Sequence, residues 1–140
     1  MNYLLDTNVV SEIRKSNCDS NVRHFVDSHN QQTFFLSAVS IGEISYGIER
    51  LPPGEKKIRF AHFLDIRIPE WFEDRIIPVD GEIMREWGKI RARTGRTLPL
   101  LDFFVAATAL ARSLTVLTRN TRDFEDIEGI LLFNPWDAVS

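Results

Sequence analysis

The stretch PLLDFFVAATALARSLTVLTRNTRDF, residues 99–124, decides the fold. Pro99 suits the first turn of a helix. The chain from there to about Arg112 is apolar nearly all round, which is typical of a helix buried at the centre of a domain. The β-rich run Thr115–Leu117 follows almost at once and predicts a strand. The stretch therefore predicts a sheet with a helix packed against it.

Short strands alternate with helical patterns on both sides of this stretch. Strands are expected at Tyr3–Leu5, at Thr33–Leu36, within Arg75–Val79 around Ile76 and Ile77, at Thr115–Leu117 and at Ile130–Phe133. Further helices are expected to begin near residues 7, 20, 40, 55 and 80, with Ile58 on a buried face, Pro69 ending the helix that begins near 55, and Gly95 at a C-cap. We expect a single α/β domain, residues 1–140, with a short parallel five-stranded sheet flanked by helices on both faces.

Composition excludes several classes of protein. A single Cys excludes an internal disulfide, and three His with one Cys are too few for a structural zinc site. Residues 1–10 lack the basic segment of a signal peptide, and the longest uncharged apolar run, Phe103–Ala111, is roughly half of what a bilayer crossing needs. We therefore expect a cytoplasmic protein without a membrane segment. The net charge of −3 argues against a general coating of nucleic acid but allows a locally basic channel.

Four of the twenty Asp and Glu residues stand out by position. Ligands of open α/β sheets bind outside the carboxyl ends of the strands. Asp6 follows the first expected strand directly, and Glu43 is expected in the first turn of the helix after the second strand. Asp102 is in the first turn of the most apolar helix, and Asp123 closely follows the fourth strand. We therefore expect these four side chains at one edge of the sheet.

Helix capping is the competing explanation for each acid. Asp6 would cap the first helix, residues 40–43 (SIGE) fit a capping box, residues 120–123 (NTRD) have similar spacing, and Asp102 would complement a helix dipole. Asp102 fits this explanation least, because its neighbours are apolar and no Lys or Arg lies within four residues of it on the helix. An ionised carboxylate is not buried without a partner or a cation.

Carboxylates that share a crevice repel one another, so at least one pKa is expected to rise unless a cation is bound. Oxygen ligands without His or Cys nearby favour Mg²⁺ or Mn²⁺ over zinc. The pattern therefore predicts a site for a hard divalent cation. On this hypothesis, replacing Asp6 or Asp102 with Ala relieves repulsion and is expected to leave the fold intact.

Four segments carry a family resemblance: Tyr3-Leu4-Leu5-Asp6-Thr7-Asn8, Ser40-x-x-Glu43, Asp102 in its apolar helix, and Leu117-Thr118-Arg119-Asn120-Thr121-Arg122-Asp123-Phe124. In order and spacing they resemble the four acidic motifs of PIN-domain nucleases, most closely those of the VapC-type toxins of bacterial toxin–antitoxin pairs. The resemblance extends over nearly the whole chain. It implies a PIN-like fold and Mg²⁺-dependent (or Mn²⁺-dependent) hydrolysis of RNA phosphodiester bonds by a metal-activated water.

The resemblance also implies roles for individual residues. Asp6 and Asp102 would be direct metal ligands, while Glu43 and Asp123 would complete the site, on a second ion or by orienting water. Hydroxyl and amide groups beside them would support the ligands or serve ordinary turn and cap chemistry: Thr7, Asn8, Thr118 and Asn120. The implied protein is the endoribonuclease toxin of a type II pair, with RNA as substrate, a small cognate antitoxin as partner and a homodimer as assembly.

Basic residues near the acids are candidates for substrate binding. Arg119 and Arg122 lie beside the expected acidic site and would hold phosphates that the acids repel. The densest basic patch is expected on the helix that begins near residue 80 and just after it, formed by Arg85, Lys89, Arg91, Arg93 and Arg96. The alternative for this helix is a solvated face with Glu82–Arg85 and Glu86–Lys89 pairs.

Two other functions fit parts of the pattern. A phosphohydrolase that forms an aspartyl-phosphate on Asp6 would place Asp after the first strand, as haloacid-dehalogenase-like phosphatases do, but residues 6–8 (DTN) lack their second Asp. A catalytically silent RNA-binding or protein-binding module on the same fold is the other alternative, although the intact acidic set speaks against it. No Gly-x-Gly occurs, so nucleotide-cofactor motifs are absent from the sequence.

Overall fold

The computed structural model describes residues 1–137, so the last three residues of the expected domain, 138–140, lie outside the described part of the chain. A five-stranded sheet forms its centre, with the strand order β3-β2-β1-β4-β5 and every neighbouring pair parallel. The strands are β1 (Tyr3–Leu5), β2 (Phe34–Ser37), β3 (Ile76–Ile77), β4 (Thr115–Leu117) and β5 (Leu131–Phe133). Tyr3 in the central strand pairs with Phe34 on one side and with Thr115 on the other.

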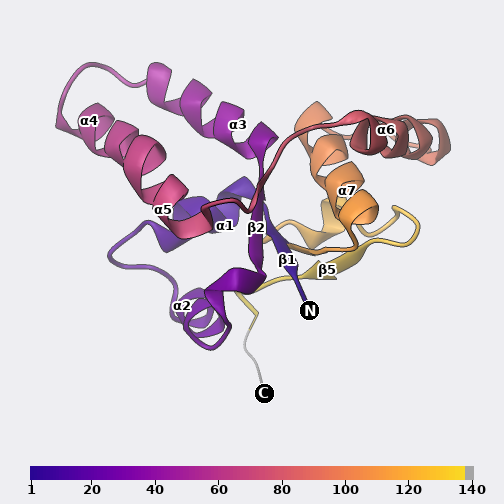
Figure 1. The fold of residues 1–140 in the computed structure, drawn as a ribbon, viewed down its shortest axis with the longest axis horizontal. Coiled ribbons are helices and arrows are strands. Elements are labelled where there is room, and N and C mark those ends of the chain that lie inside the picture. The colour runs from indigo at the N-terminus through magenta and orange to yellow at the C-terminus, as the bar shows by residue number, and fades with distance from the viewer. Residues whose placement is uncertain (138–140) are drawn as a thin grey trace.

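Helices connect the strands and cover the sheet (Figure 1). The α-helices are α1 (Thr7–Ile13), α2 (Ser20–Asp27), α3 (Ala38–Glu49), α4 (Glu55–His62), α5 (Ile68–Phe72), α6 (Gly81–Arg93) and α7 (Leu100–Arg112). Shorter helical turns are η1 (Gln31–Thr33), η2 (Phe63–Arg67, a π-helical turn) and η3 (Thr121–Asp123). In residues 1–137, no helix has both the length and the apolar character that a membrane crossing requires.

Two hydrophobic cores lie on opposite faces of the sheet. Leu4 of β1 packs in one core with Ile83 of α6 and Val105 of α7. Tyr3 and Leu5 belong to the second core, which is formed with α1, α2 and α5. Because successive residues of a strand point to opposite faces, this division places helices on both sides of the sheet (Figure 1). The predicted α/β fold with a parallel five-stranded sheet is confirmed.

Helix α3 begins earlier than the sequence indicates. The hydroxyl oxygen of Ser37 accepts a hydrogen bond from the Val39 N–H at 3.1 Å and caps the helix directly after β2. The capping box expected over residues 40–43 is therefore not formed, and Glu43 lies in the second turn of α3 rather than in the first.

The segment that follows α3 also differs from expectation. Pro69 does not end a helix but lies in the first turn of α5, and the π-helical turn η2 joins α4 to α5. Ile58, expected on a buried face, is 69% exposed. Gly95 does not take the positive φ of a C-cap glycine, because the extended backbone of Thr94 already ends α6.

Candidate active site

The parallel sheet brings four acidic positions to one edge. Asp6 directly follows β1, and Asp123 lies in η3, six residues after the end of β4. Strand β2 leads directly into α3, which carries Glu43. Helix α7 runs back to the start of β4, so its first turn, with Asp102, lies at the carboxyl edge of the sheet. The four residues come from four different segments.

Asp6 is held by its immediate neighbours. Asp6 is buried, with 8% of the residue exposed. One carboxylate oxygen accepts a hydrogen bond from the Thr7 N–H at 2.8 Å, which makes Asp6 the N-cap of α1. The other accepts one from the Thr118 hydroxyl at 2.8 Å and a longer one from the Asn8 amide at 3.4 Å. The Asp6 side chain therefore caps α1 and also belongs to the group of four acids.

Burial is the largest influence on the pKa of Asp6 and raises it. The hydrogen bonds from Thr118 and Thr7 act in the opposite direction, and the charges of Glu43 and Asp123 raise the pKa further. The net pKa lies above its ordinary value of 3.8. Asp6 therefore ionises less readily than a solvated carboxyl group.

Asp102 is the most strongly perturbed of the four. Burial in its apolar helix and, after it, the charges of Asp6, Asp123 and Glu43 together raise the pKa of Asp102 to about 6. Arg96 opposes the rise, but no Lys, Arg or His forms an ion pair with Asp102 within residues 1–137. The charges of Glu43 and Asp123 therefore act on both Asp6 and Asp102.

The described side chains do not converge on a single point. In residues 1–137, no three of the Asp, Glu, His and Cys side chains form a ready-made set of metal ligands in this conformation. The chemistry of the cluster still fits a hard divalent cation, because its charged groups are all carboxylates and two of them have pKa values raised by burial and mutual repulsion. Ligation of one ion requires the side chains to turn toward one another.

Polar residues connect the ends of β1 and β4. Asn8 donates weakly to Thr118 at 3.4 Å and accepts a hydrogen bond from the Arg119 N–H at 3.4 Å. The fully buried Thr118 hydroxyl also accepts the Asn120 N–H at 3.1 Å. The Thr7 hydroxyl is buried without a hydrogen-bond partner among the described residues. Asn120 makes no side-chain cap bond at η3, so the capping pair that was the competing explanation for residues 120–123 is not formed.

Arg96 has a role that the sequence does not reveal. Its guanidinium binds the Asp126 carboxylate in bidentate fashion at 2.8 and 2.9 Å and donates to the backbone carbonyl of Asp123 at 2.7 Å. These contacts join the connection between α6 and α7 to the loop that carries Asp123. Arg96 was expected within an open basic patch, but its charge is engaged by Asp126. The sequence does not reveal the Arg96–Asp126 pair, because its two residues lie thirty positions apart and meet only in the folded chain.

The basic residues beside the acids differ in their surroundings. Arg119 lies over the ring of Trp136, 5.1 Å from its centroid. Arg122 is exposed and forms no ion pair in the described chain. On α6, Lys89 pairs with Glu86 at 3.6 Å, as expected for a solvated face.

The fold and the acidic edge together define a class of protein. Residues 3–130 match the model of the PIN domain, and the chain belongs to this family. Within the family it groups with the toxins of the VapC type, as the following relatives show.

The VapC ribonuclease Y4jK of Sinorhizobium fredii is 31% identical over 97% of this chain and 99% of its own length. The toxin FitB of Neisseria gonorrhoeae is 36% identical over 95% of this chain and 97% of its own length. Among solved structures, FitAB bound to an IR36 DNA fragment superimposes with a TM-score of 0.89 at 32% identity, covering 99% of this chain and 98% of that chain.

Proposed function

We propose that this chain is an endoribonuclease that depends on Mg²⁺ or Mn²⁺ and acts as the toxin of a type II toxin–antitoxin pair. The observation that carries the proposal is the acidic edge: four carboxylates come from four segments, burial and neighbouring acids raise the pKa of Asp6 and of Asp102, and the half-buried Asp102 forms no ion pair in residues 1–137. A bound divalent cation would neutralise this charge. The relationship to VapC ribonucleases supports RNA as the substrate.

Asp6 and Asp102 are the proposed direct ligands. Burial and neighbouring acids destabilise the ionised form of both side chains, so a bound cation would stabilise these two carboxylates most. Glu43 and Asp123 would complete the site. A divalent ion bound there supplies a Lewis acid for the phosphate and lowers the pKa of a bound water. No protein nucleophile is needed for hydrolysis by this route.

The neighbouring residues would orient the ligands. The Thr118 hydroxyl and the Thr7 N–H hold both oxygens of Asp6, which fixes the plane of its carboxylate. Asn8 and Asn120 support Thr118 through hydrogen bonds to its hydroxyl oxygen. Arg119 and Arg122 follow Thr118 in the sequence and would bind phosphates of the substrate near the reacting bond.

The relatives suggest a protein partner for this chain. The FitAB structure on DNA and the toxin FitB support a small cognate antitoxin as a partner of this chain. We further propose a PIN domain over residues 1–140, a homodimer and a cytoplasmic location.

The surroundings of Asp6 argue against an aspartyl-phosphate mechanism. Asn8 stands where the phosphatases that form an aspartyl-phosphate have their second Asp, and the charges of Glu43 and Asp123 raise the pKa of Asp6, as expected at a cation site. The role of a metal ligand in hydrolysis therefore fits Asp6 better than the role of a nucleophile.

Cleavage of a mixed RNA pool by the purified chain, with Mg²⁺ or with EDTA, tests the proposal. We expect cleavage only with the metal, and its loss in Asp102→Asn. Asp74→Asn, which alters an exposed acid of the α5–β3 connection, is the matched control and is expected to cleave normally. Cleavage in EDTA, or equal cleavage by Asp102→Asn, would contradict the proposal.

A further inference from the structure

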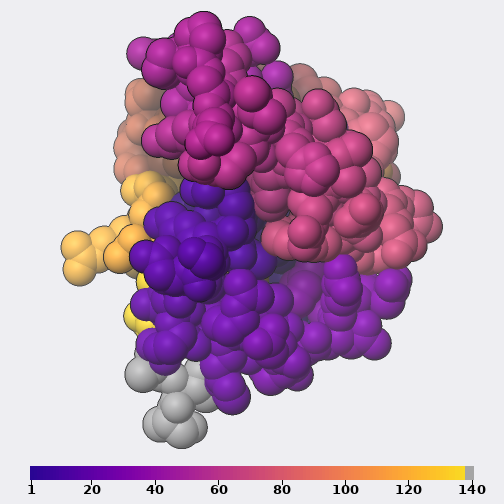
Figure 2. All heavy atoms as spheres, turned by 90° about the vertical axis from the view of Figure 1, so that its left-hand side faces the viewer, coloured from indigo at the N-terminus to yellow at the C-terminus, as the bar shows by residue number. Residues whose placement is uncertain are grey.

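A broad groove of about 980 Å³ lies between the end of α1 and the segment from α4 to α5. Figure 2 views the molecule from this side, with the indigo N-terminal segment facing the magenta and pink α3–α5 region. No Asp or Glu of the described chain lines the groove. Six basic side chains line it: Arg14, Lys15, Arg23, Arg59, His62 and Arg67. The whole protein carries a net charge of −3, so this concentration of positive charge is local.

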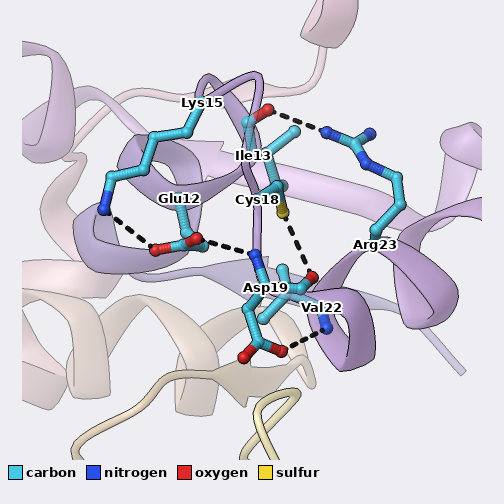
Figure 3. A network of polar contacts seen from close by, with 7 residues as sticks. All are labelled: Glu12, Ile13, Lys15, Cys18, Asp19, Val22 and Arg23. Carbon is cyan, nitrogen blue, oxygen red and sulfur yellow. Dashed lines mark hydrogen bonds and ion pairs between the residues drawn. The ribbon is translucent and has the colours of Figure 1, made fainter.

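The wall formed by the connection between α1 and α2 is held in place by polar contacts (Figure 3). The Glu12 carboxylate accepts hydrogen bonds from the Lys15 ammonium at 3.2 Å and from the Asp19 N–H at 2.9 Å. The guanidinium of Arg23 donates to the Ile13 carbonyl at 3.0 Å. This wall is therefore preformed, and its basic side chains are positioned before any ligand arrives.

Much of the positive charge is available to a ligand. Arg14 and Arg59 form no ion pair within residues 1–137. Arg23 and Arg67 have only distant, exposed carboxylate neighbours at 3.9 Å each. Such surface pairs are weak. A polyanion could replace these carboxylates at little cost.

Aromatic rings alternate with the basic side chains. The guanidinium of Arg14 lies 4.2 Å from the centroid of the Phe60 ring, and that of Arg67 lies 5.7 Å from the centroid of Trp71. Both rings line the groove and are partly exposed. Rings beside phosphate-binding cations are the usual surface for single-stranded nucleic acid, because bases stack on the rings while the backbone follows the charges.

A neighbouring cavity connects the lining of the groove to Glu43 of the acidic edge. A smaller cavity of about 230 Å³ has Thr7 and Glu43 in its lining and shares Arg14, Phe60 and Phe63 with the groove. A strand that places a phosphate at the carboxylates can therefore continue into the groove. An acidic protein segment would also match the charge of the groove, but the rings of Phe60 and Trp71 beside Arg14 and Arg67 suit stacked bases, which favours single-stranded RNA.

We infer that this groove binds the single-stranded RNA segment that flanks the cleaved bond. The inference rests on the proposed ribonuclease function and gives it a substrate path. The phosphates would lie along the arginines, and a base would stack on Phe60 or Trp71. Short RNAs would not reach the groove, so its contribution depends on substrate length.

Binding of a fluorescein-labelled single-stranded RNA of about 16 nucleotides, measured by anisotropy in EDTA, tests the groove without cleavage. The variant Arg59→Gln/Arg67→Gln removes two exposed charges from the groove. We expect roughly tenfold weaker binding and a salt slope shallower by about 0.7 for each phosphate that the protein no longer neutralises. The matched control, Arg85→Gln/Arg93→Gln, removes two exposed charges from α6 and is expected to bind normally.

Cleavage with Mg²⁺ gives the second readout. The groove variant is expected to cleave the long RNA with a raised KM and an unchanged kcat, and to cleave an RNA of about four nucleotides like the wild type. Equal RNA binding by the groove variant and the wild type would overturn the inference. Loss of cognate antitoxin binding with RNA binding intact would overturn it in favour of a protein ligand. If the wild type binds RNA through the groove but never cleaves it, the proposed function fails while the groove remains an RNA site.

Discussion

Replacing Asp102 with Asn is expected to stabilise the protein in EDTA at neutral pH. Burial and three neighbouring acids raise the pKa of Asp102 from 3.8 to about 6, which is about two pH units and corresponds to an upper bound of about 3 kcal/mol. Because the side chain is only half-buried, solvent screening reduces this to about 1–2 kcal/mol. Asn has nearly the same shape but no charge, so the free energy of unfolding is expected to rise by that amount.

The increase in the free energy of unfolding of Asp102→Asn must depend on pH in a defined direction. A carboxyl group whose folded pKa lies above its unfolded pKa binds protons more tightly in the folded state, so wild-type stability falls as the pH rises from about 4 to about 6. Below that window Asp102 is protonated in both states and no longer destabilises the fold. The advantage of Asp102→Asn is therefore full above about pH 6.5, is small near pH 4 and disappears below about pH 3.

Urea unfolding in EDTA at about pH 7.5 and about pH 4 measures this difference. Asp74→Asn is the control for the loss of one exposed acid and is expected to change stability by less than about 0.5 kcal/mol at either pH. An Asp102→Asn protein no more stable than the wild type at neutral pH, or equally stabilised at both pH values, would refute the electrostatic reasoning.

Three further changes separate the roles of neighbouring residues. Asp6→Ala is expected to lower the free energy of unfolding by about 1–3 kcal/mol in urea titrations, because the α1 cap is removed and the Thr118 hydroxyl is left without its acceptor; an unchanged stability would contradict this. Arg96→Gln is expected to reduce kcat about tenfold by freeing η3, which carries Asp123, while the free energy of unfolding changes little because the Arg96–Asp126 pair is exposed; an unaltered kcat would exclude a positioning role. Arg122→Ala should flatten the salt dependence of RNA affinity, and the same slope as wild type would remove it from the substrate path.

The fold was predictable because its signals are local. Helix α7 is apolar nearly all round and leads directly into β4, and the central strands are short buried runs that end at polar residues. The parallel order of the strands then follows from the alternation of strands and helices. Errors occur where a second local signal takes precedence over the first: α3 is capped by Ser37 at the end of its strand, and Pro69 lies in the first turn of α5.

The acidic site was predictable in position but only partly in chemistry. Topology alone indicates that residues after neighbouring parallel strands meet at one edge. The sequence does not show that Asp6 is a helix cap with both oxygens engaged, so removing it was expected to relieve repulsion, whereas its contacts now predict a loss of stability. The Arg96–Asp126 pair and the basic groove depend on residues distant in sequence, which no local pattern brings together.

Calorimetric titration of Mn²⁺ into EDTA-stripped protein tests the central claim, that the four carboxylates hold a divalent cation. The titration is made above about pH 7, where the ligands are ionised. We expect the wild type and Asp74→Asn to bind the ion, and Asp102→Asn to bind it at least about tenfold more weakly. Equal Mn²⁺ affinity of Asp102→Asn and the wild type, or no binding by either, would contradict the account.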